Sequence, residues 1–225
     1  MKQILISCLI SIPVITLAQY RSFDFFQESS IIHSKGRQKQ EIIKQYRLVN
    51  SISGDQLPLQ KTGGKYIASL YDPVAGLLHY FNIYNTDTRF VAEYAMSYVH
   101  TDATSIQTSA PASALHTVAT PTAPLEYELK VYTHAADKKA DYIFQVKLAK
   151  AKYNDLGTTV DNPSVQNAVK NALTAELEDA ACCHRIIGYK AQRRKGSYVV
   201  EYKIQKSTPV SIDLVVPQAL RLQSK

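Results

Sequence analysis

The chain has 225 residues, carries a formal net charge of +7, and contains 15 tyrosines but only three cysteines. So few cysteines exclude a disulfide-rich scaffold, and the stability must therefore come from a hydrophobic core. The length is enough for two small domains or one large one, and the positive charge favours an acidic partner.

Residues 1–18 have the pattern of a secretory signal peptide. The apolar run over residues 4–17 is too short and too broken to span a bilayer, and Ala18 ends a small-residue cleavage site. Two alternatives are a lipoprotein box that lipidates Cys8 and an uncleaved membrane anchor. No other apolar stretch approaches the roughly 20 residues that a spanning helix needs. We therefore expect an exported mature chain, periplasmic or extracellular, without a transmembrane segment.

Residues 19–100 are predicted to form an N-terminal module, a helix followed by a three-stranded meander. After a polar break, residues 41–49 place Ile42, Ile43, Tyr46 and either Leu48 or Val49 at helical spacing. Residues 65–99 alternate apolar and polar side chains in three runs that are separated by turn residues. This alternation predicts three antiparallel strands.

Residues 101–124 consist mainly of alanine, threonine, serine and proline, with Asp102 as their single charge and no hydrophobic periodicity. This composition is typical of a flexible, partly extended linker, so we place a domain boundary here. The alternative is a long loop between neighbouring strands of one sheet, because the alternating run that starts at Leu125 can pair with either module.

Residues 125–225 predict a C-terminal module of β-β-α-β-β type. Its clearest element is a helix over residues 163–181, which begins at Pro163 with Asn162 as its N-cap and repeats an apolar residue every four positions. Alternating strands at 125–131 and 142–148 precede it, and strands at 198–204 and 210–216 follow. The whole chain is thus predicted to be α+β, with small antiparallel sheets each packed by a helix.

The sequence offers no catalytic motif, no metal site and no cofactor site. Lys61-Thr62-Gly63 matches one box of the serine β-lactamases, but no Ser-x-x-Lys precedes it, and we interpret it as a turn. Cys182 and Cys183 are adjacent, which strains a tetrahedral metal centre, so we predict buried thiols or a disulfide.

A basic, tyrosine-rich hairpin is the predicted binding site. Positive side chains and tyrosines alternate on two strands that join at residues 194–196, where anionic groups can be paired and stacked upon. The predicted residues are Lys190, Arg193, Arg194, Lys195, Tyr198, Tyr202 and Lys203. The alternative interpretations are a solvated hairpin tip and half-buried sheet tyrosines.

Two functional hypotheses follow. The first is an exported, non-enzymatic binding or adaptor protein that contacts an acidic protein, a glycan or an envelope surface; a nucleic acid is not the expected partner. The second is a secreted hydrolase whose site is assembled only in the fold. A pocket with convergent titratable side chains would favour the hydrolase.

Overall fold

The computed structural model describes residues 20–36, 40–86, 89–99, 115–177, 183–195, 197–217 and 220, and their regular secondary structure is mostly β-strand. The strands are β1 Tyr20–Lys35, β2 Glu41–Val49, β3 Gln56–Thr62, β4 Lys65–Asp72, β5 Leu77–Asn85, β6 Phe90–Val99, β7 His116–Ala123, β8 Glu126–Tyr132, β9 Tyr142–Lys150, β10 His184–Arg193 and β11 Tyr198–Val215. The helix is α1 Pro163–Glu176. All strands belong to one 11-stranded sheet in the order β6-β5-β4-β3-β2-β1-β11-β10-β9-β8-β7, and every neighbouring pair is antiparallel.

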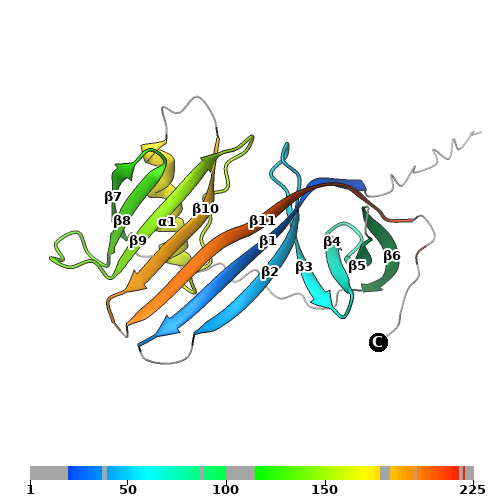
Figure 1. Cartoon of the computed structure of the whole chain (residues 1–225), viewed down its shortest axis with the longest axis horizontal. Coiled ribbons are helices and arrows are strands. Elements are labelled where there is room, and N and C mark those ends of the chain that lie inside the picture. Colours follow the sequence, from blue (N-terminus) through cyan, green and yellow to red (C-terminus); the bar gives the residue numbers. More distant parts are fainter. Residues whose placement is uncertain are drawn as a thin grey trace, which may run out of the picture.

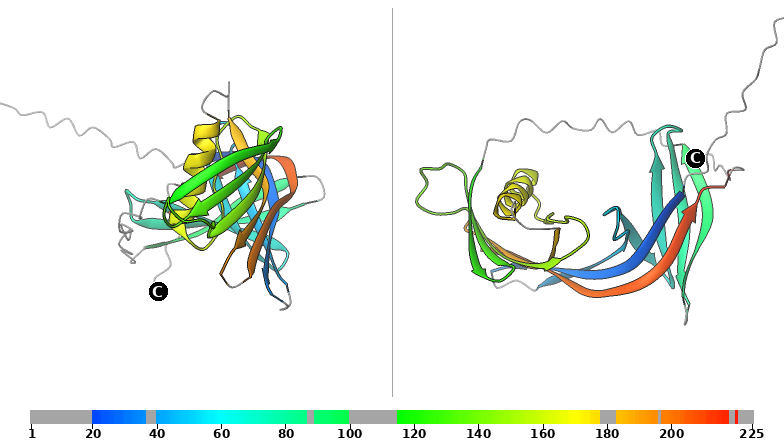
Figure 2. Two further views of the ribbon diagram at one scale, coloured as in Figure 1. Left: turned by 90° about the vertical axis from the view of Figure 1, so that its left-hand side faces the viewer. Right: turned by 90° about the horizontal axis from the view of Figure 1, so that it is seen from above.

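The sheet is strongly bent, and its two ends are covered in different ways (Figures 1 and 2). The long strands β1 and β11 run through the middle and pair along most of their length. At one end α1 lies in the concave side of the sheet, against β7 to β10. At the other end β3 to β6 curl round, so that β6 approaches β11.

Two separate hydrophobic clusters match these two ends. The α1 core contains the buried face of α1 with apolar residues of β8, β9, β10 and β11, including Leu129, Phe144 and Val200. The aromatic core lies inside the curled end, and it includes Phe26 and Phe81. The rings of Phe26 and Phe90 stack with their centroids 4.7 Å apart, so β1 and β6 touch across this end.

The helix begins where the sequence predicts it. The Asn162 side chain accepts hydrogen bonds from the backbone N–H groups of Ser164, at 3.0 Å, and Val165, at 3.3 Å. Val165, Val169 and Leu173 are buried against the sheet. The helix ends at Glu176, short of the predicted end at Ala181, and residues 178–182 lie outside the described part of the chain. A negative charge in the last turn opposes the helix dipole, which is consistent with the early end.

The prediction of an α+β fold is wrong, because the described chain forms one continuous antiparallel sheet with a single helix. The two strands predicted at 198–204 and 210–216 are one long strand, β11. Residues 56–62, between the predicted helix and the predicted meander, form β3, which tolerates Pro58 because that residue pairs with β2 and has no partner in β4. The three-stranded meander is present as β4, β5 and β6.

The helix predicted at residues 41–49 is strand β2. Its apolar spacing also fits an extended chain: Tyr46 and Leu48 point into the aromatic core, whereas Ile42 is 61% exposed. Pairing with β1 and β3 on either side decides between the two structures, which a short apolar run leaves ambiguous.

The linker prediction is wrong for residues 116–123, because they form β7 and pair with β8. Residues 101–114 lie outside the described residues, as do the predicted signal peptide and Cys8. The division into two domains stays a prediction: the sheet is continuous, while its core is split in two. Within the part of the chain that the structure describes, no helix is long and apolar enough to cross a membrane.

A candidate ligand cleft at the β10–β11 hairpin

The sheet separates the predicted binding residues onto its two faces. Side chains alternate along a strand, and Tyr189 and Ala191 of β10 face α1, so Arg193 continues the concave face. Tyr198 and Tyr202 of β11 share that face. The remaining strand residues of the set, Lys190 and Lys203, occupy the opposite face, where Lys190 pairs with Glu201 at 3.1 Å.

Two adjoining hollows open on the concave side between the hairpin and the start of α1. The larger has a volume of about 320 Å³ and is lined by Tyr142, Val160, Asp161, Asn162, Pro163, Ala191, Arg193, Tyr198 and Val200. The smaller has about 200 Å³ and is lined by Leu115, Val131, Tyr132, Thr133, Asp141, Tyr142, Asn162, Val165, Arg193 and Lys195. We call the two together the hairpin cleft, and Tyr142, Asn162 and Arg193 line both hollows.

The three cations of the hairpin tip are in different situations. Arg194 is neutralised, because its guanidinium contacts Asp141 at 3.1 Å and its backbone N–H donates to the Asp141 carbonyl at 2.9 Å. Arg193 instead lies over the Tyr142 ring, with 5.7 Å between the guanidinium carbon and the ring centroid. Arg193 forms no ion pair within 4.0 Å with any described residue. Lys195 lines the smaller hollow.

The carboxylate of Asp141 is held ionised by its neighbours. The hydroxyl of Thr133 donates to it at 2.5 Å and lowers the pKa of Asp141, and the Thr133 N–H and Arg194 act in the same direction. Because this negative charge is already paired, the smaller hollow keeps the positive charges of Arg193 and Lys195.

The two hairpin tyrosines are engaged within the fold. The Tyr198 hydroxyl forms a hydrogen bond with Nδ1 of His33 on β1, and burial raises the pKa of Tyr198, with Asp161 adding to the effect. Tyr202 is 6% exposed and stacks on Tyr189 with 5.5 Å between ring centroids. Tyr198 thus presents its ring to the cleft, whereas Tyr202 is a core residue and does not line it.

A polar network that the sequence did not reveal lies between the two cores. The Arg47 guanidinium donates to the side-chain oxygens of Gln27 at 2.7 Å, Gln56 at 2.6 Å and Tyr202 at 2.8 Å. Its terminal nitrogen is 3.8 Å from Asp155. These five residues, the Arg47 network, come from β1, β2, β3, β11 and the segment before α1. No local pattern predicts such a network, because the fold alone brings its members together.

One arrangement resembles a catalytic triad without being open to substrate. Nδ1 of His79 lies 2.6 Å from Oγ of Ser97, and Nε2 lies 4.0 Å from Asp72. Ser97 is 0% exposed and His79 is 1% exposed. Burial lowers the pKa of His79, while Asp72 acts in the opposite direction. A nucleophile must reach its substrate, so this trio lends no support to the hydrolase hypothesis.

The predicted cysteine site is only partly described. Cys183 is half-buried, and its carbonyl accepts a hydrogen bond from the Ala151 N–H at 2.9 Å. Cys182 lies outside the described residues, so the redox state of the pair stays a prediction. Among the residues whose positions are described, no three His, Cys, Asp or Glu side chains gather in a way that could hold a metal ion.

The chain was compared with protein-family models, curated proteins and solved structures. No family model and no curated protein matches the sequence. One similar solved structure is a LolA superfamily protein from Nitrosomonas europaea, with 6% sequence identity and a TM-score of 0.23; the match covers 83% of this chain and 86% of that chain. Another is an outer membrane lipoprotein-sorting protein domain from Vibrio parahaemolyticus, with 9% identity and a TM-score of 0.21; the match covers 83% of this chain and 85% of that chain.

Proposed function

We propose that the chain is a non-enzymatic binding protein, and that its hairpin cleft holds a ligand in which an anionic group adjoins an apolar part. The observation that carries this proposal is the position of Arg193. Its charge has no acidic partner among the described residues, and it stands in the shared wall of two hollows, of which the larger is otherwise mostly aromatic and aliphatic and the smaller is more polar.

The chemistry of the cleft gives the ligand an orientation. The anionic group belongs in the smaller hollow, where Arg193 and Lys195 meet it and where Arg194 already neutralises Asp141. The apolar part belongs in the larger hollow, against Val160 and Val200. Asp161 lines this larger hollow and repels a second negative charge there.

The start of α1 reinforces the preference for an anion. Asn162 and Pro163 line the larger hollow, and Asn162 also lines the smaller one, so the positive end of the helix dipole lies at the cleft. Ligand pockets commonly have volumes of roughly 300–1,000 Å³. The cleft therefore suits one small molecule, or one end of a larger anionic partner such as an acidic protein, a glycan or an envelope component. Export to the periplasm or the exterior is part of the proposal and depends on residues 1–18.

The test uses two dyes with the same ring system, 8-anilinonaphthalene-1-sulfonate and the uncharged N-phenyl-1-naphthylamine. We expect Arg193→Gln to lower the affinity for the sulfonate dye by roughly tenfold or more, since a hydrogen bond to a charged group contributes about 1.5–3 kcal/mol. Binding of the uncharged dye should be almost unchanged, because the apolar lining is intact.

The matched control is Lys203→Gln, which removes the same charge from the neighbouring strand on the opposite face. If both variants lower the affinity for the sulfonate dye equally, the effect is one of net charge and the proposal fails. It also fails if the unaltered chain binds neither dye.

A further inference from the structure

The larger hollow of the hairpin cleft holds two opposite charges that do not pair with each other. Arg193 and Asp161 both line it. Asp161 nevertheless forms no ion pair within 4.0 Å with any residue that the structure describes. The guanidinium of Arg193 is held over the Tyr142 ring, 5.7 Å from its centroid. The hollow therefore offers a ligand a positive group and a negative group at two separate points.

The negative group lies beside an aromatic ring. Burial raises the pKa of Tyr198, and the negative charges of Asp161 and, less strongly, Glu41 add to this effect. The hydroxyl of Tyr198 is held by Nδ1 of His33, so the position of the ring at the hollow is fixed. The π-system of such a ring attracts a positive charge, and a nearby carboxylate adds a direct Coulomb attraction. This corner of the cleft therefore suits a cationic group.

The rest of the lining favours an alkylated ammonium over a primary one. A primary ammonium has three N–H donors that need acceptors. The Asn162 side-chain oxygen already accepts hydrogen bonds from two backbone N–H groups of α1. Four other lining side chains are apolar and supply no acceptor, namely Val160, Pro163, Ala191 and Val200. Alkyl groups on the nitrogen pack against such side chains, and aromatic rings commonly recognise quaternary ammonium groups.

We propose that the hairpin cleft binds a zwitterion in which an anionic group is joined by a short chain to an alkylated ammonium. This inference rests on the function proposed above and narrows the class of ligand. The anionic group again lies by Arg193 and Lys195. The apolar part in the larger hollow now carries a positive charge, which meets Asp161 and the Tyr198 ring. Phosphocholine has this chemistry, both as a free molecule and as the head group of a lipid.

Asp161 also has a structural role, which the test must separate from binding. It directly precedes Asn162, the N-cap of α1, and a carboxylate there stabilises the positive end of the helix dipole. Replacing Asp161 is therefore expected to lower stability whether or not a ligand binds. A comparison of two ligands on the same protein avoids this difficulty, because a loss of stability affects both alike.

The two ligands are phosphocholine and 3,3-dimethylbutyl phosphate, which has a neutral carbon in place of the charged nitrogen and nearly the same shape. Isothermal titration calorimetry measures the binding of each to the full chain. We expect phosphocholine to bind roughly fivefold more tightly or better. The chain has a net charge of +7, so attraction by its overall charge would favour the other phosphate, which lacks the positive charge. The expected preference therefore reports a local negative site.

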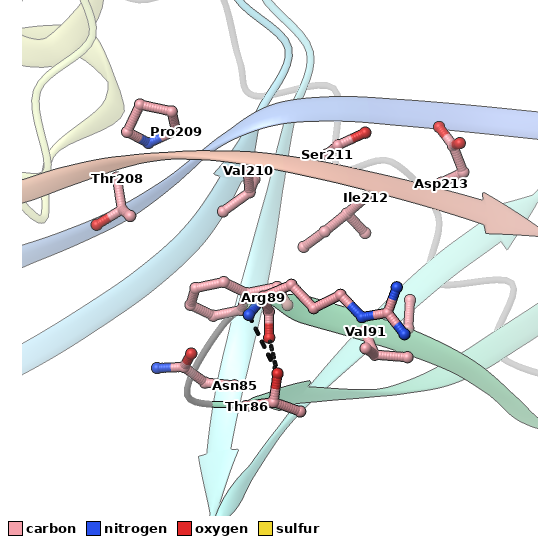
Figure 3. A pocket seen from close by; sticks show the side chains of 12 residues that line it. Asn85, Thr86, Arg89, Val91, Thr208, Pro209, Val210, Ser211, Ile212 and Asp213 are labelled. Carbon is pink, nitrogen blue, oxygen red and sulfur yellow. Dashed lines mark hydrogen bonds between the residues drawn. The ribbon is translucent and has the colours of Figure 1, made fainter.

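Three variants assign the two charges of the ligand to their sites. Asp161→Asn should remove most of the preference for phosphocholine, whereas Arg193→Gln should lower the affinity for both phosphates and keep the preference. Asp213→Asn is the matched control, because it removes the same charge at a different hollow, of about 800 Å³, which residues 89–92 and 208–213 help to line (Figure 3). Asp213 accepts a hydrogen bond from the Tyr20 hydroxyl at 2.7 Å, and its replacement should leave the preference intact.

Equal affinity for the two phosphates would overturn the zwitterion, and the function proposed above would survive if Arg193→Gln still lowers the affinity for the sulfonate dye. If neither phosphate nor the dye binds, both proposals fail. A preference that Asp213→Asn removes and Asp161→Asn keeps would also overturn the assignment to the hairpin cleft. Vesicles of phosphatidylcholine distinguish the two sources of the group: co-sedimentation that phosphocholine reverses supports a lipid head group, and binding of phosphocholine without co-sedimentation supports a free zwitterion.

Discussion

The two ends of the sheet solve the same problem, an apolar concave face, by different means. Around the α1 core a helix covers the strands with Val165, Val169 and Leu173. Around the aromatic core no helix is described, and the sheet bends until β6 meets β1 through the rings of Phe26 and Phe90. Each solution leaves its own opening: a cleft where the helix begins, and a slot where the bent sheet does not close. The openings of this protein are therefore consequences of how each end is covered.

The largest expected loss of stability comes from creating a cavity in either core. Phe81 in the aromatic core and Leu173 in the α1 core are both fully buried. Phe81→Ala should cost about 3–5 kcal/mol of unfolding free energy and Leu173→Ala about 2–5 kcal/mol. Denaturant unfolding followed by circular dichroism measures both.

The same two variants show whether the ends unfold together. Because β1 and β11 run through both ends, we expect each variant to shift a single transition. Two transitions, of which each variant shifts only one, would mean that the two ends are independent domains, as the sequence predicts.

The Arg47 network joins the two ends, and its removal should have the next largest effect. Arg47→Met leaves the side-chain oxygens of Gln27, Gln56 and Tyr202 without their donor. Unsatisfied buried groups cost about 1–3 kcal/mol each, so we expect a loss within that range after relaxation. Lys44→Met on the same strand is the control, because it removes only an exposed pair with Glu28, which contributes about 0–1 kcal/mol. Equal losses would show that the network stabilises the fold no more than an exposed ion pair does.

The N-cap of α1 affects one end alone. Asn162→Ala removes the acceptor of two backbone N–H groups and should cost about 0.5–2 kcal/mol. Asn171→Ala, at an exposed position within the helix, should be neutral or slightly stabilising because alanine is the better helix former. Amide exchange should quicken in α1 and in the strands beneath it, while the aromatic core keeps its protection. Faster exchange in both cores would contradict this separation.

The smallest effect is a pH dependence that arises at the aromatic end. Burial lowers the pKa of His79 below its unfolded value of 6.5. The folded state therefore binds this proton less readily, so the contribution of His79 is complete above pH 6.5 and is lost as the pH falls through the lower, folded pKa. Stability measured at several pH values should decline less on acidification in His79→Gln than in the unaltered chain. Parallel declines would assign the effect to other groups.

The sequence predicted the elements that have strong local signals. The helix begins as expected because Asn162 and Pro163 act on the next few residues, whatever surrounds them. Strand β7 is not predicted, because its residues are mostly exposed at the edge of the sheet. An exposed strand needs no alternating apolar residues, so its sequence lacks that signal. Strand β2 was misread because pairing with its neighbours, which a single sequence does not show, decides between helix and strand there.

The sequence likewise predicted only the part of the candidate site that has a local signal. Arg193, Lys195 and Tyr198 were predicted and line the hairpin cleft, whereas Lys190 and Lys203 alternate onto the other face. The other walls of the cleft come from β9 and from the start of α1, which are distant in sequence. Only the fold brings them together.

The proposed ligand site is tested most directly by a map of where an anionic amphiphile binds. The unaltered, isotope-labelled chain is titrated with 8-anilinonaphthalene-1-sulfonate, and backbone amide shifts are followed by NMR. We expect the shifts to gather around Tyr142, Asn162 and Arg193, and in Arg193→Gln to need roughly tenfold more of the sulfonate dye. Shifts that gather between residues 89–92 and 208–213, or that spread evenly over the protein, would contradict the assignment of the ligand to the hairpin cleft.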